Sequence, residues 1–178
     1  MAHSDFLIKD NVLTKYIGQG GDVIVPDGIT RIRNNAFLNC DKVTSITLPN
    51  GIEFIGTKAF AGCNGLADKD GFVIVKNVLY SYCGKTADVN VPNGVDCIGT
   101  GAFAGKSIVS VTIPACVSTI EHQAFISCRK LTKVKILNGN TKISDNAFMW
   151  SDKVKIYAPS GGTIEEFAKE KNIPFVAE

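Results

Sequence analysis

The chain has 178 residues, is 45% hydrophobic and 20% charged, and carries a formal net charge of +2. This is the composition of a globular domain, and the small net charge gives no reason to expect a nucleic-acid or membrane-surface partner. No apolar run approaches the roughly 18 residues of a membrane-spanning helix, and the start, MAHSDFLIKD, lacks the features of a signal peptide. A cytosolic chain and the mature part of a secreted one both remain open.

Two similar segments each predict a β-hairpin. Residues 6–29 (FLIKDNVLTKYIGQGGDVIVPDGI) contain two β-rich runs joined by Asp10-Asn11, and residues 72–95 repeat the pattern 66 positions later with Lys76-Asn77 as the joint. Two polar residues between two such runs are typical of the turn of a β-hairpin. We expect the first hairpin to cap the N-terminal end of the fold and the second to project from one edge.

An Ala-Phe pair recurs five times, each with an isoleucine four residues before the alanine. The pairs are Ala36-Phe37, Ala59-Phe60, Ala102-Phe103, Ala124-Phe125 and Ala147-Phe148, at intervals of 23, 43, 22 and 23 residues. A fixed period in the twenties indicates stacked structural repeats. The interval of 43 is then one unit plus the second hairpin.

Each unit of about 22–23 residues has the same order of signals. An alternating apolar segment such as Ile46-Thr47-Leu48 predicts a strand with one buried face. Proline then ends the strand in most units, and a turn leads to a second apolar segment. The Ala-Phe pair is expected to form a single helical turn with the phenyl ring in the core. Stacking of units covers the apolar face that each exposes alone.

The C-terminal segment differs from the repeats. Residues 153–157, KVKIY, predict a last strand, and TIEEFAKEK after Gly161-Gly162 predicts a short helix. Thr163 and Glu166 have the spacing of a capping box. Ile164, Phe167 and Ala168 would share one face of this helix and cover the final repeat.

The unit I-P-x-G-V-x-x-I-x-x-x-A-F-x-x-C-x-x-L resembles the BspA-like leucine-rich repeats of bacterial surface and secreted proteins. The resemblance covers nearly the whole chain, with Lys106 and Gly139-Asn140 as departures. It implies an α/β leucine-rich-repeat solenoid: a curved, β-rich stack with a concave parallel sheet and short helical turns. The expected organisation is a single domain, 1–178, with a hairpin cap at 1–22, two repeats at 23–67, an inserted hairpin at 68–90, the remaining repeats at 91–157 and a C-terminal cap at 158–178.

Three of the six cysteines, Cys40, Cys63 and Cys128, follow a repeat phenylalanine by three residues. The slot set by the repeat favours reduced, structural thiols in the core. A disulfide between Cys40 and Cys63 remains possible, because adjacent coils would bring them near each other. The absence of a CxxC pair argues against a metal site.

The sequence offers no catalytic pattern and no cofactor motif. His3 falls near the N-terminus, and His122 falls in a polar turn before Ala124-Phe125, where a solvated role is expected. We therefore predict a chain that is not an enzyme and uses no cofactor or metal.

Four lysines stand out near the C-terminal strands. Counting back from the expected strand ends places Lys133 beside Lys153 and Lys135 beside Lys155 on the concave face, whereas Asp22 and Asp88 take matching positions in earlier units. Clustered like charges repel each other, and an anion relieves that repulsion. The four lysines are therefore a candidate partner patch. The alternative is that they guard an exposed sheet edge.

Aromatic residues give a second candidate surface. Tyr80 and Tyr82 alternate on the inserted hairpin and would share a face. Trp150 would either cover the last repeat against the helix or stand exposed as a binding anchor.

The function expected from these features is a non-catalytic recognition or adhesion module, extracellular or on the cell surface, that binds a protein or an anionic glycan. A monomer without membrane insertion and without nucleic-acid binding is expected. The alternative function is a structural spacer that holds another domain away from a cell surface.

Overall fold

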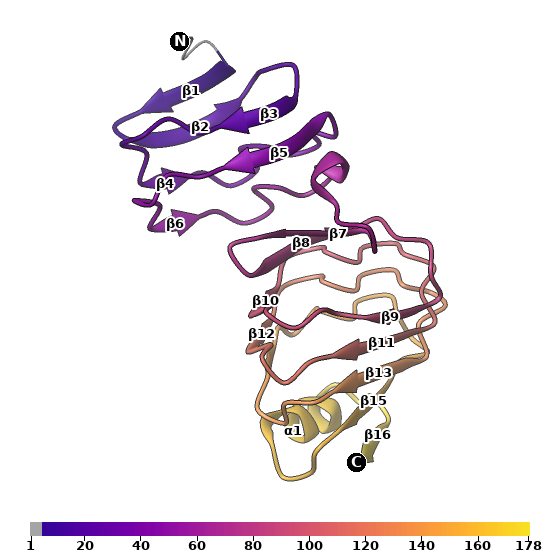
Figure 1. Cartoon of the computed structure of the whole chain (residues 1–178). Coiled ribbons are helices and arrows are strands. Elements are labelled where there is room, and N and C mark those ends of the chain that lie inside the picture. The colour runs from indigo at the N-terminus through magenta and orange to yellow at the C-terminus, as the bar shows by residue number, and fades with distance from the viewer. Residues whose placement is uncertain (1–4) are drawn as a thin grey trace. The chain divides into compact units, whose positions relative to one another are not determined.

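The structure, a computed structural model, describes residues 5–178. They divide into two compact units. The first holds the residues up to Val75 together with Tyr80–Gly84, and the second holds Lys76–Leu79 together with Lys85–Glu178. Within each unit the chain winds in successive coils that stack on one another, so each unit is a β-solenoid (Figure 1).

The first unit opens with the antiparallel hairpin of β1 (Phe6–Lys9) and β2 (Val12–Tyr16). The turn residues Asp10 and Asn11 have φ angles of 50° and 61°, the left-handed pair that two-residue hairpin turns require. The hairpin prediction is confirmed here. Its second strand is also a rung of the solenoid, since β2 pairs in parallel with β4 (Arg31–Ile32), which pairs with β6 (Phe54–Ile55).

A second, two-stranded parallel sheet of the first unit joins β3 (Gly21–Ile24) to β5 (Val43–Thr47). Val23 and Val43 are buried, while their neighbours along the strands face outward. The 3-10 helix η2 (Asn64–Leu66) and strand β7 (Phe72–Val75) follow.

The second unit has two parallel sheets. One continues from Val78 and Leu79 of β8 (Val78–Tyr82) through β10 (Cys97–Ile98) and β12 (Thr119–Ile120) to β14 (Lys142–Ile143). The other, called the outer sheet below, runs in the order β9 (Asp88–Asn90), β11 (Ser110–Ile113), β13 (Lys133–Ile136), β15 (Lys155–Ala158) and β16 (Phe175–Ala177).

The second hairpin, β7 and β8, does not project from an edge, which corrects the sequence-based expectation. Val78 pairs with Cys97 and Leu79 with Ile98, so β8 forms a rung as β2 does. Tyr80 and Tyr82 are 5% and 1% exposed. Their shared face points into the core because β7 and β8 carry large apolar side chains that a free hairpin would leave in water.

Aromatic rings form the centre of each unit. In the first, Tyr16, Phe37 and Phe60 follow one another at centroid distances of 5.1 and 4.9 Å. In the second, Phe103 stacks on Phe125 at 4.9 Å, and Phe125 stacks on Phe148 at 5.3 Å. Both Phe60 and Phe103 are fully buried, as their place in the repeat predicts. Offset ring stacking adds to the free energy gained by burial.

The Ala-Phe segments form reverse turns, not the helical turn expected from the sequence. The backbone N–H of Phe125 donates to the carbonyl of Ala147 in the next coil (2.9 Å), and the N–H of Ser127 donates to that of Met149 (2.9 Å). These bonds between coils alternate with turn bonds inside the segment, such as the one from the Ile126 N–H to the Gln123 carbonyl (3.0 Å), so every second N–H points to the next coil and no helix forms.

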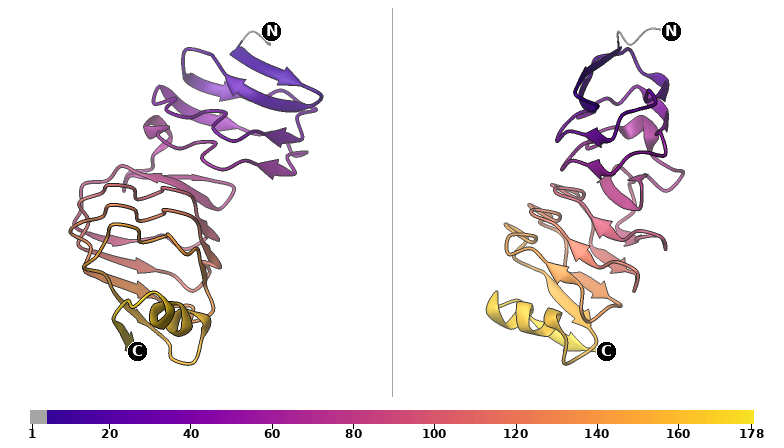
Figure 2. Two further views of the ribbon diagram at one scale, coloured as in Figure 1. Left: turned by 180° about the vertical axis from the view of Figure 1, so that it is seen from behind. Right: turned by 90° about the vertical axis from the view of Figure 1, so that its left-hand side faces the viewer.

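The C-terminal cap consists of α1 (Thr163–Glu170) and β16, and it lies beside the last coil (Figure 2). Ile164 and Ala168 are fully buried, which confirms the predicted apolar face. The predicted capping box is wrong: Gly162 is the N-cap, and Glu165, not Glu166, reaches back to accept the Gly161 N–H at 2.7 Å.

Candidate functional site

The lysines of the outer sheet pair in a different register from the one predicted. Lys133 lies opposite Lys155, and Lys135 lies opposite Tyr157. Lys153 precedes β15 in a turn, so the predicted pairs Lys133/Lys153 and Lys135/Lys155 are wrong by two residues. The reason is that β15 ends at Ala158, before Pro159, just as β11 ends at Ile113 before Pro114.

Lys133 and Lys155 both lie close to one aromatic ring. The ammonium nitrogen of Lys133 lies 4.8 Å from the centroid of the Tyr157 ring, and that of Lys155 lies 5.7 Å from it. Both lysines are exposed and Tyr157 is half-buried. A cation near an aromatic face is attracted by the negative potential of the ring. The tyrosine therefore holds two like charges close together on the surface.

The third lysine of the sheet face is partly neutralised. The ammonium nitrogen of Lys135 lies 2.7 Å from a carboxylate oxygen of Glu178, which follows β16. The hydrogen bond from Lys135 lowers the pKa of the Glu178 carboxyl, and the charge of Lys133 lowers it further. We call Lys133, Lys135, Lys155 and Tyr157 the basic face.

Neither β13 nor β15 is an edge strand. β16 pairs with β15 on its outer side, with Ile156 opposite Phe175. Side chains at Lys133 and Lys155 project from the face of the sheet, so the alternative that they guard an open edge does not apply to them.

The other end of the outer sheet carries the opposite charge. The hydroxyl of Ser110 donates to the carboxylate of Asp88 at 2.5 Å. Asp88, Ser110, Lys133 and Lys155 occupy one row across four strands. The sign of the surface charge therefore changes within three strand spacings of about 4.8 Å each.

Lys153 lies apart from the basic face. It lines a surface hollow of about 630 Å³ together with Arg129, Trp150 and Asp152. Trp150 is 63% exposed, so the structure matches the exposed alternative and not the one in which the indole covers the last repeat. Tyr80 and Tyr82 form no exposed aromatic surface, because both are buried.

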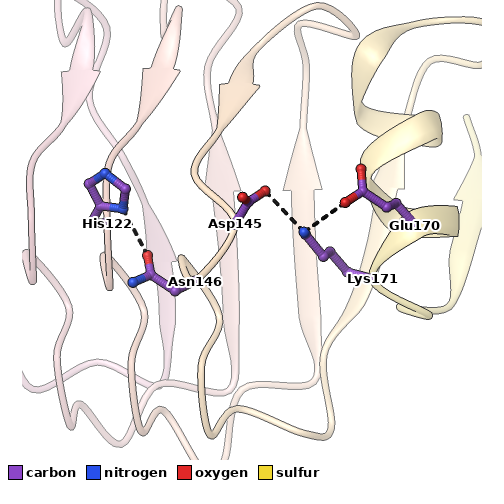
Figure 3. A network of polar contacts seen from close by, with 5 residues as sticks. All are labelled: His122, Asp145, Asn146, Glu170 and Lys171. Carbon is purple, nitrogen blue, oxygen red and sulfur yellow. Dashed lines mark hydrogen bonds and ion pairs between the residues drawn. The ribbon is translucent and has the colours of Figure 1, made fainter.

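The polar side chains around His122 tie neighbouring coils and the cap together (Figure 3). The Nδ1 atom of His122 lies 3.0 Å from the amide oxygen of Asn146. The ammonium of Lys171 lies between two carboxylates, 3.0 Å from Asp145 and 2.8 Å from Glu170. His122 thus contacts a side-chain amide, not a nucleophile. His3 lies outside the described residues.

Cysteine thiols at the repeat slot donate into the preceding coil. The Cys63 thiol donates to the carbonyl of Phe37 at 2.9 Å, and the Cys128 thiol donates to that of Phe103 at 3.0 Å. Ser151, in the same slot of the last repeat, donates to Phe125 at 2.6 Å. Burial raises the pKa of Cys63 to about 12 and that of Cys128 to about 11. All six cysteines are free thiols, so Cys40 and Cys63 are not bridged.

Cys40 and Lys106 differ from the other slot residues for a common reason. Each belongs to the first coil after a hairpin, where no earlier Ala-Phe turn offers a carbonyl. Cys40 is accordingly half-buried, and its nearest acceptor, the Leu38 carbonyl, is 4.0 Å away.

The sequence did not predict two residues at this site: Tyr157, which belongs to the basic face, and Glu178, which forms an ion pair with Lys135. Tyr157 would have been found by aligning Ala158-Pro159 with Ile113-Pro114 instead of ending the strand at residue 157. The sequence carries no signal for Glu178, because its contact with Lys135 depends on the course of the chain through α1 and β16.

The described residues, 5–178, contain neither a candidate metal-binding group nor a candidate membrane-spanning helix. No three His, Cys, Asp or Glu side chains of this range come together in a group that could hold a metal ion. No helix in this range has the length and apolar character needed to cross a membrane.

Comparison with known proteins identifies the repeat. The family model for the BspA type leucine rich repeat region matches residues 15–70 and 69–170, in six copies. No curated protein sequence matches the chain significantly.

A solved structure of a bacterial leucine-rich-repeat protein shares the fold, and two further bacterial structures are similar at lower TM-scores. The Treponema pallidum leucine-rich-repeat protein TpLRR is 23% identical with a TM-score of 0.51, over 100% of this chain and 99% of that one. The pneumococcal vaccine antigen PcpA is 20% identical with a TM-score of 0.47, over 96% of this chain and 45% of that one. A cell surface protein of Faecalibacterium prausnitzii is 19% identical with a TM-score of 0.44, over 89% and 59%. The chain thus spans less than two thirds of the last two.

Proposed function

Because this chain belongs to the family of BspA-type leucine-rich repeats, we propose that it is a non-catalytic recognition module of a secreted or surface-displayed bacterial protein. The partner is a protein or a glycan that carries negative charge, and it binds to the basic face of the outer sheet. The proposed location rests on the family.

The observation that carries this proposal is the position of Lys133 and Lys155 beside the ring of Tyr157. The fold itself does not need these side chains, since the core positions of the same strands are Val134 and Ile156, both fully buried. Two ammonium groups beside one ring repel each other, and an anionic group placed between them would relieve that repulsion. The ring would add apolar contact area to the same site, as tyrosine does in many interfaces.

The charge pattern would also orient the partner. Asp88, at the far end of the same row, would repel an anion that the basic face attracts. Complementary charge of this kind mainly raises the association rate and fixes the register of binding. Catalysis is not part of the proposal, since His122 contacts the amide of Asn146 at 3.0 Å.

A charge-reversal experiment tests the proposal. The double variant Lys133→Glu, Lys155→Glu is compared with a control of equal charge change, Lys142→Glu, Lys169→Glu, whose positions lie in β14 and α1. Retention on immobilised heparin and binding to an acidic peptide are measured at low and physiological salt. We expect weaker binding at the higher salt, where the Debye length is about 8 Å, and loss of binding only in the basic-face variant.

Tyr157→Ala should weaken binding without changing its salt dependence, because it removes contact area and no charge. Equal binding by both charge variants would contradict the proposal and leave the spacer function as the remaining interpretation.

A further inference from the structure

The second residue after each repeat phenylalanine occupies the left-handed region of φ. These residues are Asn39, Gly62, Gly105, Ser127 and Trp150, with φ angles of 60°, 75°, 68°, 58° and 59°. Glycine and asparagine adopt this conformation readily, whereas a bulky side chain does so only under strain. The geometry of the turn therefore favours small residues in this slot, and Trp150 is the exception.

Burial does not compensate for the strain at Trp150. The residue is 63% exposed, the largest exposed fraction among the aromatic residues of the part of the chain described. An indole gains free energy from folding only in proportion to the area it removes from water. Nothing in the packing of the coil explains its presence. A strained conformation that packing does not explain points to a functional role.

The backbone that carries the indole is firmly held. The carbonyl of Met149 accepts from the Ser127 N–H at 2.9 Å, and the Ser151 hydroxyl donates to the Phe125 carbonyl at 2.6 Å. The residues on both sides of Trp150 are thus bonded to the preceding coil. The ring is presented to solvent from a rigid support, which lowers the conformational entropy lost when a ligand binds.

Polar groups of both signs surround the indole. It borders the hollow of about 630 Å³ that it shares with Arg129, Asp152 and Lys153. It also borders a second hollow of about 390 Å³, where Phe148, Phe167 and Lys171 contribute to the lining. Both volumes fall in the range of small-molecule sites. Cations and carboxylates are interspersed here, whereas the basic face carries three lysines with one carboxylate, Glu178, beside them.

We propose that Trp150 is the stacking platform of a second binding site, one that takes an uncharged saccharide. One face of a pyranose ring presents C–H groups, which carry slight positive charge and are attracted to the negative face of an aromatic ring. The hydroxyl groups at its rim both donate and accept hydrogen bonds. They would find acceptors in the carboxylate of Asp152 and donors in Arg129 and Lys153.

The mixture of charges favours an uncharged ligand over an anion. A sulfated or acidic ligand would meet Asp152, which lines both hollows, and Asp145, which lines the second. Burying one of these carboxylates against a second negative charge would oppose binding. The site is thus independent of the proposed function in both its location and its ligand chemistry.

Trp150 reports on its own site, because the sequence contains one tryptophan. The emission of the whole chain is followed during titration with uncharged oligosaccharides: chitotetraose, cellotetraose, mannotetraose and maltotetraose. A saturable blue shift with at least one of them, together with protection from acrylamide quenching, is the expected result. No change with any of the four at millimolar concentration would overturn the inference.

Variants separate stacking from the fold. Trp150→Gly inserts the residue found at Gly62 and Gly105, so the melting temperature should stay equal or rise. Ligand-observed NMR should then show binding weakened at least about tenfold, or about 1.4 kcal/mol. Ser127→Gly makes the same backbone change one coil earlier and should bind as the parent does.

Asp152→Asn should weaken saccharide binding less than Trp150→Gly. Lys133→Glu, Lys155→Glu should leave it unchanged, so the two sites can fail separately. Unaltered saccharide binding by Trp150→Gly would show that the sugar binds elsewhere and would overturn the assignment. Loss of a protein partner in Trp150→Gly, with no response to sugars, would identify the indole as a protein contact instead.

Discussion

The two units of the molecule begin alike, and the charge on the outward side of their strands then differs. In the first, the Ser45 hydroxyl donates to Asp22 at 2.7 Å, and in the second the Ser110 hydroxyl donates to Asp88 at 2.5 Å. The two aspartates are 66 residues apart in the sequence and the two serines 65. Both pairs lie on the outward side of equivalent parallel strands. The second unit then continues through β13 and β15, where lysine takes the place of the acidic row.

The interior shows no such change. Phe37 and Phe60 in the first unit, like Phe103 and Phe125 in the second, stack at 4.9 Å and are fully buried. The core thus repeats almost unaltered while the outward row of the strands varies. A difference between the units in binding should therefore be separable from any difference in stability.

The largest effect should come from the rings that the units share. Replacing Phe60 or Phe125 by Ala removes a fully buried ring from the middle of a stack and should lower the free energy of unfolding by about 3–5 kcal/mol. Urea denaturation of each variant measures this. If the free energy of unfolding fell by less than about 1 kcal/mol in one of the two variants, the unit that holds that phenylalanine would not depend on its ring stack.

Substitution of the cysteine three residues after the repeat phenylalanine should cost more stability in a coil that follows another repeat than in a coil that follows a hairpin. Cys63→Ala and Cys128→Ala each remove one of two donors to a buried carbonyl, which keeps the backbone N–H of Cys40 or Lys106, and should lower stability by about 0.5–1.5 kcal/mol. Cys40→Ala should change it by less than about 0.5 kcal/mol, since its sulfur has no close acceptor. Cys128→Ser, which supplies the hydroxyl that Ser151 already uses, should recover most of the loss. Equal losses at Cys40 and Cys63 would contradict this distinction.

The same thiols predict how stability depends on pH. The folded-state pKa values of Cys63 and Cys128 are about 12 and about 11, against an unperturbed value of about 8.5. As pH rises above about 8.5, the unfolded chain releases these protons first, so the thiols contribute a loss of stability with rising pH. Urea midpoints measured between pH 7 and 10 should fall less steeply in the double variant Cys63→Ser, Cys128→Ser. Identical slopes in parent and variant would rule out the thiols as the cause.

Substitutions in the outward-facing charged row of the strands should have the smallest effect on stability. Lys133→Glu, Lys155→Glu changes exposed side chains and should shift the free energy of unfolding by no more than about 0.5 kcal/mol. Thermal melts of this variant and of Asp22→Asn, Asp88→Asn should overlay that of the parent. A clear destabilisation by the lysine variant alone would mean that the contacts with Tyr157 support the fold.

The sequence predicted the solenoid because its periodic residues are the ones buried by stacking. It failed where two structures satisfy the same pattern. Alternation in KVKIYAP places Lys153, Lys155 and Tyr157 on one face in either register, and pairing Lys153 instead of Lys155 with Lys133 shifted the prediction by two residues. Alternation at Tyr80 and Tyr82 predicted a shared face but not which side of the hairpin meets the core.

The exposed position of Trp150 was also undetermined by sequence. The indole could pack on the last coil or point into solvent, and which of the two occurs depends on how closely α1 approaches that coil. Side chains such as Ile164 and Ala168, both fully buried, set this approach. Periodicity carries no information on such a distance.

The pairing of β2 with β4 and of β8 with β10 has a consequence for how such chains grow in evolution. A hairpin that serves as a rung presents the same hydrogen-bonding edge to the coil that follows it as any repeat does. A gene segment that encodes a hairpin and its following coils can therefore be copied in tandem without a new interface having to arise. The 66-residue offset between the two hairpins equals the length of a segment that holds one hairpin and the coils that follow it.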